Sequence, residues 1–231
     1  MKKLIVAALA LLVSVSSFAQ LGLIGGVTST STTLKSAYAD IAKTQNANLY
    51  HAGVVYKIAL PHGFAVQPGV IYNVKGQSIK ENINVGITNL SDINLDASTG
   101  YLEIPLQLRW GIESGELGVY VFGEPYVGYA LTTQTKASAS DDTTQKLIDT
   151  LGINDAEEDE KWNGRNRFAY GVGAGVGIEL FGFLDFSVRY FWDLGPMFTE
   201  DGQCSVSAQA VYEAVEDQKC TGIAASLAIR F

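Results

Sequence analysis

The stretch 101-YLEIPLQLRW-110 decides the fold, because apolar and polar residues alternate along it. Aliphatic residues occupy the even positions 102 to 108, whereas Glu103, Gln107 and Arg109 stand at odd positions between them. Side chains alternate between the two faces of a β-strand with a period of two. The stretch therefore predicts a strand with one apolar face and one charged face.

The same alternation recurs along most of the chain. It predicts strands at 20–31, 48–60, 63–76, 101–112, 117–133, 165–180, 183–194 and 220–231. The connections are short at 61–63, 113–116 and 181–182, and long at 32–47, 77–97, 134–164 and 195–219. Outer-membrane barrels have short periplasmic turns, long extracellular loops and periplasmic termini. We therefore expect an all-β, eight-stranded antiparallel up-and-down transmembrane β-barrel. A ten-stranded barrel is the alternative, in which the second or fourth long loop contributes an additional hairpin.

The N-terminus has the order of a secretory signal peptide. Lys2 and Lys3 precede the apolar run Leu4 to Val13, and small residues follow at Ser17 and Ala19. The run is too short for a transmembrane helix, which needs about 20 apolar residues. We expect residues 1–19 to be cleaved, leaving residues 20–231 as a single barrel domain. The net charge of −8 argues against nucleic acid as a partner.

The two strand faces predict opposite environments. Residues expected to face lipid are Leu102, Ile104, Leu106, Leu108, Val172, Val176, Phe186, Val188, Leu227 and Ile229. An interior charge network is expected from Lys57, Lys75, Glu103, Arg109, Glu124, Glu179, Asp185, Arg189 and Arg230. An eight-stranded barrel is just wide enough for side chains to fill, and unpaired buried charges cost several kcal/mol. We expect a polar plug rather than a pore. The alternative is a soluble sandwich whose charged face meets water.

Glycines alternate at positions 171 to 177, so one face of this predicted strand carries no side chains. No helical pattern follows, which excludes a phosphate-binding loop. We expect the glycines to make room for the inward side chains of Tyr120, Phe122 and Tyr126.

Three motifs and the last residue resemble a known family. YLEIPLQLRW (101–110), YVFGEPYVGYAL (120–131), YGVGAGVGIEL (170–180) and the terminal Phe231 are similar to the PorT-like outer-membrane β-barrel proteins of Bacteroidota. The resemblance implies an eight-stranded barrel inserted by the barrel-assembly machinery, with Phe231 as the assembly signal. One type of member takes part in type IX secretion, which would make this chain a secretion or envelope-biogenesis component.

Residues suited to catalysis or metal binding are few. His51 lies on the inward parity and could meet a serine or an aspartate from neighbouring loops, whereas His62 falls in a short turn. The acidic run 155–160 lacks the spacing of an EF-hand, and we expect no catalytic, cofactor or metal site. Cys204 and Cys220 are predicted to form a disulfide, with free thiols as the alternative. Closing the 15 intervening residues would contribute about 3 kcal/mol.

The function that follows is a non-enzymatic outer-membrane barrel, structural or interacting at the surface through its extracellular loops. A lipid-modifying enzyme using His51 and a soluble lipocalin-like binder are weaker alternatives, and the binder would need an apolar interior. Expected partners are outer-membrane lipids, lipopolysaccharide, the barrel-assembly machinery and an unknown loop-binding protein, with the chain a monomer. Because Ile83, Val85 and Ile87 alternate, we expect the third and fourth strands to extend beyond the membrane. A short helix is predicted near 143–151.

Overall fold

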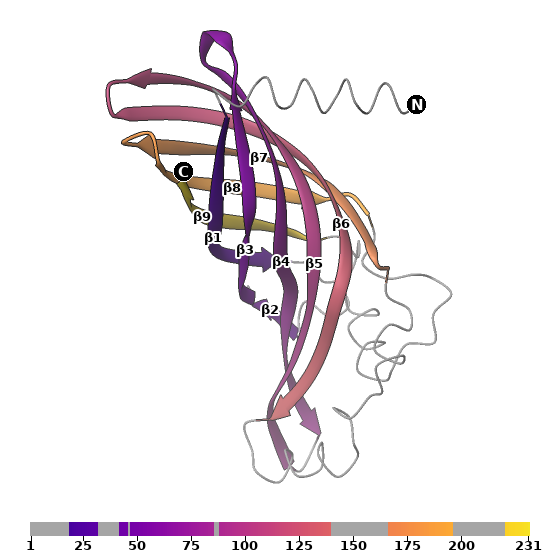
Figure 1. The fold of residues 1–231 in the computed structure, drawn as a ribbon. Helices are drawn as coiled ribbons and strands as arrows, with labels where there is room; N and C mark the ends of the chain where they lie inside the picture. Colours follow the sequence, from indigo (N-terminus) through magenta and orange to yellow (C-terminus); the bar gives the residue numbers. More distant parts are fainter. Residues whose placement is uncertain (1–18, 32–41, 46, 86–87, 140–165, 196–219) are drawn as a thin grey trace, which may run out of the picture.

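The computed structural model describes residues 19–31, 42–45, 47–85, 88–139, 166–195 and 220–231, nearly all of them in strands (Figure 1). The strands are β1 (Ala19–Ser31), β2 (Ala42–Gln45), β3 (Ala47–Ala59), β4 (Phe64–Val85), β5 (Thr88–Ser114), β6 (Leu117–Ala139), β7 (Phe168–Leu180), β8 (Leu184–Asp193) and β9 (Thr221–Arg230). Within this part of the chain, no helix has the length and apolar character needed to cross a membrane.

Eight of these strands close into a ring in which every neighbouring pair is antiparallel. Each strand from β3 to β9 pairs with the next, and β1 pairs with both β3 and β9, which closes the ring. The short β2 pairs only with β4, outside the ring. The eight-stranded antiparallel up-and-down barrel is therefore confirmed, and a ten-stranded barrel and a sandwich are excluded for the described residues.

The short connections all lie at one end of the barrel, which we call the turn end. They are the 3₁₀ turn η2 (Pro61–Gly63), the turn at Gly115 and the turn at Phe181–Gly182. Phe181 adopts a φ of 55°, in the left-handed region, which a tight reversal between β7 and β8 requires. The C-terminus is held at the same end, where Phe231 N donates a hydrogen bond to Leu21 O over 2.8 Å. The predicted short turns are confirmed, and the opposite end is the loop end.

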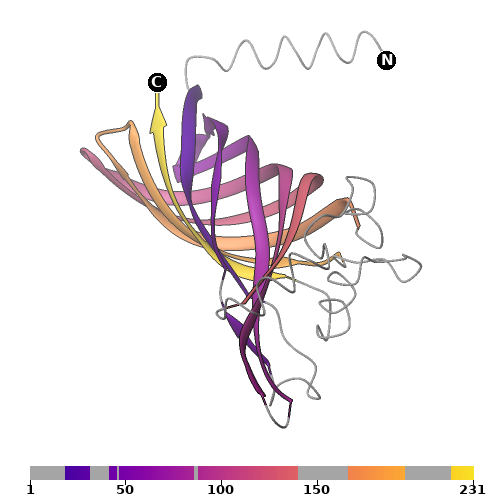
Figure 2. The same cartoon turned by 90° about the horizontal axis from the view of Figure 1, so that it is seen from below.

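Three neighbouring strands are much longer than predicted. β4, β5 and β6 have 22, 27 and 23 residues, whereas β8 and β9 have 10 each. A membrane-spanning strand needs about 9–11 residues. The excess continues past the ring at the loop end (Figures 1 and 2). We call this part the projection: β2 with residues 76–85, 88–98 and 131–139.

The prediction of a loop at 77–97 is wrong, because β4 and β5 extend into this range. β4 and β5 stay paired as far as Val85↔Thr88, so apart from 86–87 the expected loop consists of strand. The loop predicted at 134–164 likewise begins later, because β6 continues to Ala139. The predicted extension of the third and fourth strands beyond the membrane span is borne out by their lengths, although Ile87 lies outside the described residues.

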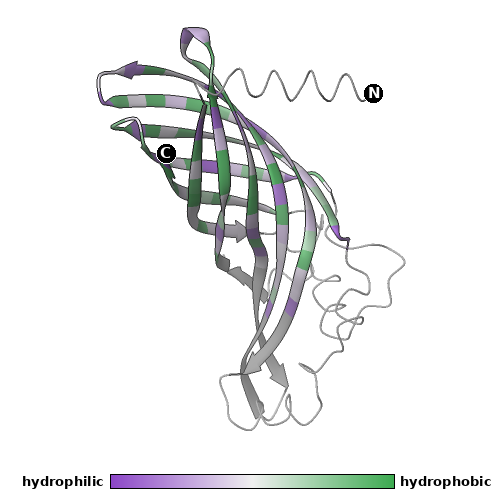
Figure 3. Cartoon of the chain, viewed as in Figure 1, coloured by the Kyte–Doolittle hydropathy of each residue, from purple (hydrophilic) through white to green (hydrophobic). Residues whose placement is uncertain are grey.

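Exposure alternates along the barrel strands, as hydropathy does (Figure 3). All ten residues that the sequence assigns to lipid lie on the outer surface, with exposed fractions from 38% for Leu102 to 59% for Val176. The inward positions are buried, and many of them are polar or charged. The molecule is thus apolar outside and polar inside, which is opposite to a lipocalin-like binder.

The glycines of β7 allow large rings to fill the interior. A Cβ at Gly171, Gly175 or Gly177 would overlap the ring of Tyr126, Phe122 or Tyr120, respectively. The prediction that these glycines make room for the inward aromatic residues of the preceding strand is confirmed.

Several predictions fall outside the described residues. They concern the signal peptide up to residue 18, the helix near 143–151, the acidic run 155–160 and Cys204.

Candidate functional site

The charged interior residues form two clusters. The turn-end cluster comprises Lys57, Arg109, Glu179, Asp185 and Arg230. Lys57 Nζ lies 2.7 Å from Glu179 Oε2, and Arg109 Nη1 lies 2.7 Å from Asp185 Oδ2. Arg230 contacts both carboxylates, with Nη1 2.5 Å from Glu179 Oε2 and Nη2 in an ion pair with Asp185. Each carboxylate therefore bridges two cations from different strands.

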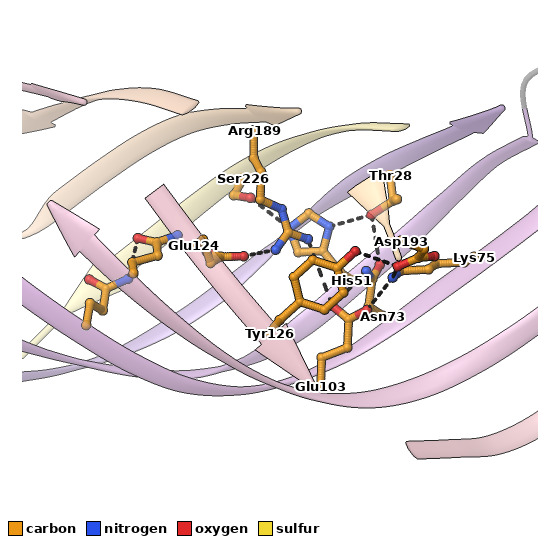
Figure 4. A network of polar contacts seen from close by, with 12 residues as sticks. Thr28, His51, Asn73, Lys75, Glu103, Glu124, Tyr126, Arg189, Asp193 and Ser226 are labelled. Carbon is orange, nitrogen blue, oxygen red and sulfur yellow. Dashed lines mark hydrogen bonds and ion pairs between the residues drawn. The ribbon is translucent and has the colours of Figure 1, made fainter. Parts of the chain in front are cut away.

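The loop-end cluster comprises Lys75, Glu103, Glu124, Arg189 and Asp193 (Figure 4). Lys75 Nζ lies 2.7 Å from both Glu103 Oε1 and Asp193 Oδ1. Arg189 pairs with Glu124 and approaches Glu103, with 4.0 Å between Nη2 and Oε2. All five side chains are at most 8% exposed. Such charges are tolerated only because they are paired, since burying one alone costs several kcal/mol.

Aromatic rings lie against one cation of the turn-end cluster and both cations of the loop-end cluster. Lys75 Nζ lies 4.5 Å from the centroid of the Tyr126 ring and 4.9 Å from that of Phe191. The Arg109 guanidinium lies 4.3 Å from the Tyr120 ring. Rings at these distances attract a cation through their quadrupole and exclude water around it. The interior is consequently filled by ion pairs and aromatic side chains at these two levels.

A neutral pair of amides lies between the clusters. Gln67 Nε2 donates to Gln107 Oε1 over 3.3 Å, and Arg109 Nε donates to the same oxygen over 2.8 Å. Gln67 and Gln107 are 1% and 6% exposed. The amide pair is therefore buried and is linked to the turn-end cluster through Arg109.

His51 lies in a chain of hydrogen bonds that fixes its tautomer. Asn73 Nδ2 donates to Glu103 Oε2 over 3.1 Å, so the amide oxygen of Asn73 accepts from Thr28 Oγ1 at 3.0 Å. Thr28, having donated its proton, must accept from His51 Nδ1 at 2.9 Å. In the neutral imidazole with its proton on Nδ1, Nε2 accepts from Ser226 Oγ at 2.9 Å.

The nine residues assigned to the interior network are all 9% exposed or less, and each takes part in an ion pair. Sequence reasoning missed Asp193, which the structure places in the loop-end cluster. The signal was present, because Asp185, Arg189 and Asp193 share the inward parity of β8. With Asp193 included, the buried charges among the described residues balance at five cations and five carboxylates: Lys57, Lys75, Arg109, Arg189, Arg230, Glu103, Glu124, Glu179, Asp185 and Asp193.

Cys220 is a buried free cysteine that packs with Tyr126 and Phe191. Its predicted partner Cys204 lies outside the described residues, so the disulfide stays a prediction. Within the described part of the chain, no group of three or more His, Cys, Asp or Glu side chains is arranged to hold a metal ion.

The turn end holds a cavity of about 480 Å³, which we call the turn-end chamber. Lys57, Arg109, Glu113, Tyr120 and Glu179 are among its lining residues. Its lining combines Lys57, Arg109 and Glu179 of the turn-end cluster with outward-facing apolar residues of the rim, among them Leu60, Phe64 and Trp110.

An apolar outer face, a closed ring of strands and a charged, paired interior define an integral outer-membrane β-barrel. The family model described as outer membrane protein beta-barrel domain matches residues 14–199, and the chain belongs to this family. The family places the protein in the outer membrane. The narrower PorT-like assignment stays a prediction.

Solved structures of three proteins are among those similar to this chain. Neisserial surface protein A is 11% identical with a TM-score of 0.38, over 92% of this chain and 97% of that one. Ail of Yersinia pestis is 7% identical with a TM-score of 0.38, over the same shares. OprG of Pseudomonas aeruginosa is 11% identical with a TM-score of 0.35, over 92% and 96%. Similarity at this level carries no functional argument. No curated protein sequence matches the chain.

Proposed function

We propose that this protein is a non-enzymatic surface protein of the outer membrane, in which the barrel is an anchor and the loop end contacts partners outside the cell. The observation that carries the proposal is the contrast between the filled interior and the long projection. A barrel used for transport needs an open lumen. The lumen of this barrel instead contains five buried cations and five buried carboxylates. A barrel used for surface contact needs structure beyond the membrane, which the projection supplies.

Among the described residues, the edge of β6 in the projection has no pairing partner on one side. Residues 132–139 of β6 pair with residues 93–100 of β5 on one side. On the other side the last contact is Ala130 N donating to Arg167 O over 2.7 Å, and no described residue pairs with 131–139. Unpaired backbone groups on an edge strand can bind an extended segment of another protein as an added strand. The stretch LTTQTKASA (131–139) is polar and rich in threonine. Threonine favours strand pairing, and the polar composition limits non-specific aggregation at the edge.

The proposal includes an orientation. The loop end faces outward and the turn end, with both termini, faces the periplasm, as short turns do in this class of barrel. The outer apolar face contacts lipid and lipopolysaccharide, and the barrel is a monomer. Phe231, which is 74% exposed, is the signal read by the barrel-assembly machinery.

Cysteine labelling on intact cells tests the orientation. In a Cys204→Ser, Cys220→Ser background, Gln134→Cys on the projection should react with a membrane-impermeant maleimide. Glu116→Cys in a turn is the matched control and should react only after lysis. Labelling of Glu116→Cys on intact cells would reverse the orientation and remove the basis for a surface role.

A shortened projection tests the function itself. Gln77 pairs with Ala97, so residues 78–96 can be replaced by an Asn-Gly turn between them. Cells carrying this variant should lose attachment to protein-coated surfaces, while the barrel still migrates differently on gels before and after boiling. Unchanged attachment by a variant that reaches the surface would contradict the proposal.

The contact between Ser226 and His51 favours one second candidate, a lipid-modifying enzyme. A serine hydroxyl that donates to a neutral imidazole has the arrangement of a nucleophile with its base. The imidazole is oriented by Thr28 rather than directly by a carboxylate. A fluorophosphonate reagent that labels the wild type but neither Ser226→Ala nor His51→Gln would establish this activity. The lipid-modifying activity would be excluded if the reagent does not label the wild type and if cells that carry His51→Gln have unchanged lipid A.

The secretion role rests on the PorT-like sequence motifs. Deleting the gene and comparing the export of surface proteins tests it, and normal export would dismiss it.

A further inference from the structure

The turn-end chamber brings a lysine and an arginine to an opening of the barrel. Lys57 and Arg109 both line it, and the cluster beneath adds Arg230. The carboxylates available to these three cations inside the barrel are Glu179 and Asp185. Each of the two is already shared between two cations. The floor of the chamber therefore carries one positive charge in excess.

The loop-end cluster has one carboxylate in excess, and Glu113 adds a further carboxylate at the rim of the chamber. Glu113 Oε1 lies 3.7 Å from Lys57 Nζ, which is too long for a hydrogen bond, and its side chain is 74% exposed. By comparison, Lys57 lies 2.7 Å from Glu179, whose side chain is 10% exposed. An exposed ion pair of this kind contributes little to stability, about 0–1 kcal/mol. Glu113 is thus the carboxylate that another anion can replace.

A second observation supports an anion at this level. Nε of Arg230 is buried without a hydrogen-bond partner among the described residues. A guanidinium has five hydrogen-bond donors and no acceptor, so the partner that Nε–H lacks is an anionic or neutral oxygen. Arg230 Nε–H is therefore a buried donor that a ligand oxygen could satisfy. The reverse holds for Gln20, which pairs with Lys57 across the strands, because its Oε1 is a buried acceptor without a partner among the described residues.

We propose that the turn-end chamber binds the anionic head group of a small organic molecule, a carboxylate or a phosphate, on Lys57 and Arg109 in place of Glu113. The volume of about 480 Å³ lies within the range of small-molecule sites. Ala59, Ala65 and Tyr120 also line the chamber and suit a compact apolar or aromatic remainder. The ligand enters from the compartment that the turn end faces. The site is independent of the projection and of the proposed surface role.

Calorimetric titration of the full-length protein in a zwitterionic detergent tests the site, with benzoate and phenyl phosphate as probes. Glu113→Gln removes the competing carboxylate at an exposed position and should raise the affinity by about three- to fivefold, the size of one exposed ion pair. Lys57→Gln should lower it by tenfold or more. Arg167→Gln removes an exposed arginine at the loop end and is the matched control, which should bind as the wild type does.

The two probes separate the two head groups. Binding of benzoate alone would indicate a carboxylate ligand, and binding of phenyl phosphate alone would indicate a phosphate ligand. Binding of both would indicate that the site recognises the negative charge that they share. Each of these outcomes supports the site if Glu113→Gln binds the probe more tightly than the wild type does. The absence of heat for both probes at millimolar concentration, or equal affinities in wild type and Glu113→Gln, would overturn the proposal. The affinity of Lys57→Gln is used only if the gel mobility of this variant still changes on boiling, which shows that it folds. If the variant does not fold, the affinity of Glu113→Gln relative to the wild type decides the test.

Discussion

Lys75 on β4 and Asp193 on β8 form an ion pair, with 2.7 Å between Nζ and Oδ1, across the full width of the barrel. The two strands are fourth neighbours in the ring of eight in either direction, so they lie opposite each other. Lys75 Nζ is at the same distance from Glu103 on β5. One lysine thereby connects β8 to the paired strands β4 and β5 on the opposite side of the barrel.

We expect Lys75→Met to destabilise the barrel by about 3–5 kcal/mol, because it leaves Glu103 and Asp193 buried without their cation. Urea unfolding of the protein in lipid vesicles measures the free energy. The triple variant Lys75→Met, Glu103→Gln, Asp193→Asn removes the orphaned charges as well and should recover most of the loss. A loss below about 1 kcal/mol for the single variant would show that the pair is hydrated and not part of a dry plug.

Gly177→Ala should destabilise the barrel by about 1–3 kcal/mol, because the added Cβ overlaps the ring of Tyr120 and overpacking costs this much. Gly123→Ala is the matched control, since its Cβ meets nothing within 4 Å on the outer surface. Pairing Gly177→Ala with Tyr120→Leu should restore part of the stability by freeing the space. Equal unfolding midpoints for the two glycine variants would contradict the ring-over-glycine packing.

The sequence predicted the barrel well because membrane strands obey two strong constraints, a period of two and a fixed length. Phe181–Gly182 and 61–63 were located by where the alternation stops, and both are turns in the structure. The alternation of Ile83, Val85 and Ile87 predicted that the third and fourth strands extend beyond the membrane. It did not show that 77–85 pairs with 88–97 almost without interruption, so 77–97 was also predicted as a loop.

The interior was predictable as a set of residues but not as a set of pairs. Parity places Arg109 and Asp185 inside, yet their ion pair depends on the stagger of the closed barrel, which one sequence does not specify. The same holds for Ser226 and His51, which lie on different strands 175 residues apart. Asp193 was missed although the predicted strand 183–194 contains it and it shares the inward parity of Asp185 and Arg189.

An arginine on the outer face tests lipid contact. Val188→Arg lies near the middle of β8, and an arginine at the bilayer midplane costs about 2–4 kcal/mol. Gln134→Arg on the projection adds the same charge to an exposed position and should cost little. Folding into vesicles followed by urea unfolding measures both. A cost below about 0.5 kcal/mol at position 188 would place water or protein, not hydrocarbon, against this face.

The predicted disulfide between Cys204 and Cys220 can be counted directly. Protein purified without reductant, then denatured and treated with maleimide, should gain no adduct if the bond is present and two if both thiols are free. Cys204→Ser should then lower the free energy of unfolding by about 3 kcal/mol in the chain-entropy account. Two adducts on the unreduced wild type would leave Cys220 as the buried thiol that packs with Phe191.

The wild-type protein should not conduct ions when reconstituted into a planar bilayer. An ion passing through the lumen would have to cross the loop-end cluster, where Lys75, Glu103 and Glu124 are at most 1% exposed and the rings of Tyr126 and Phe191 cover the lysine. The turn-end chamber is lined by Lys57, Arg109 and Glu179 of the cluster at that end. An open porin reconstituted in the same lipid serves as the control for insertion and sensitivity. Steady conductance from the wild type would show that the plug moves aside, and the barrel would then be a channel rather than an anchor.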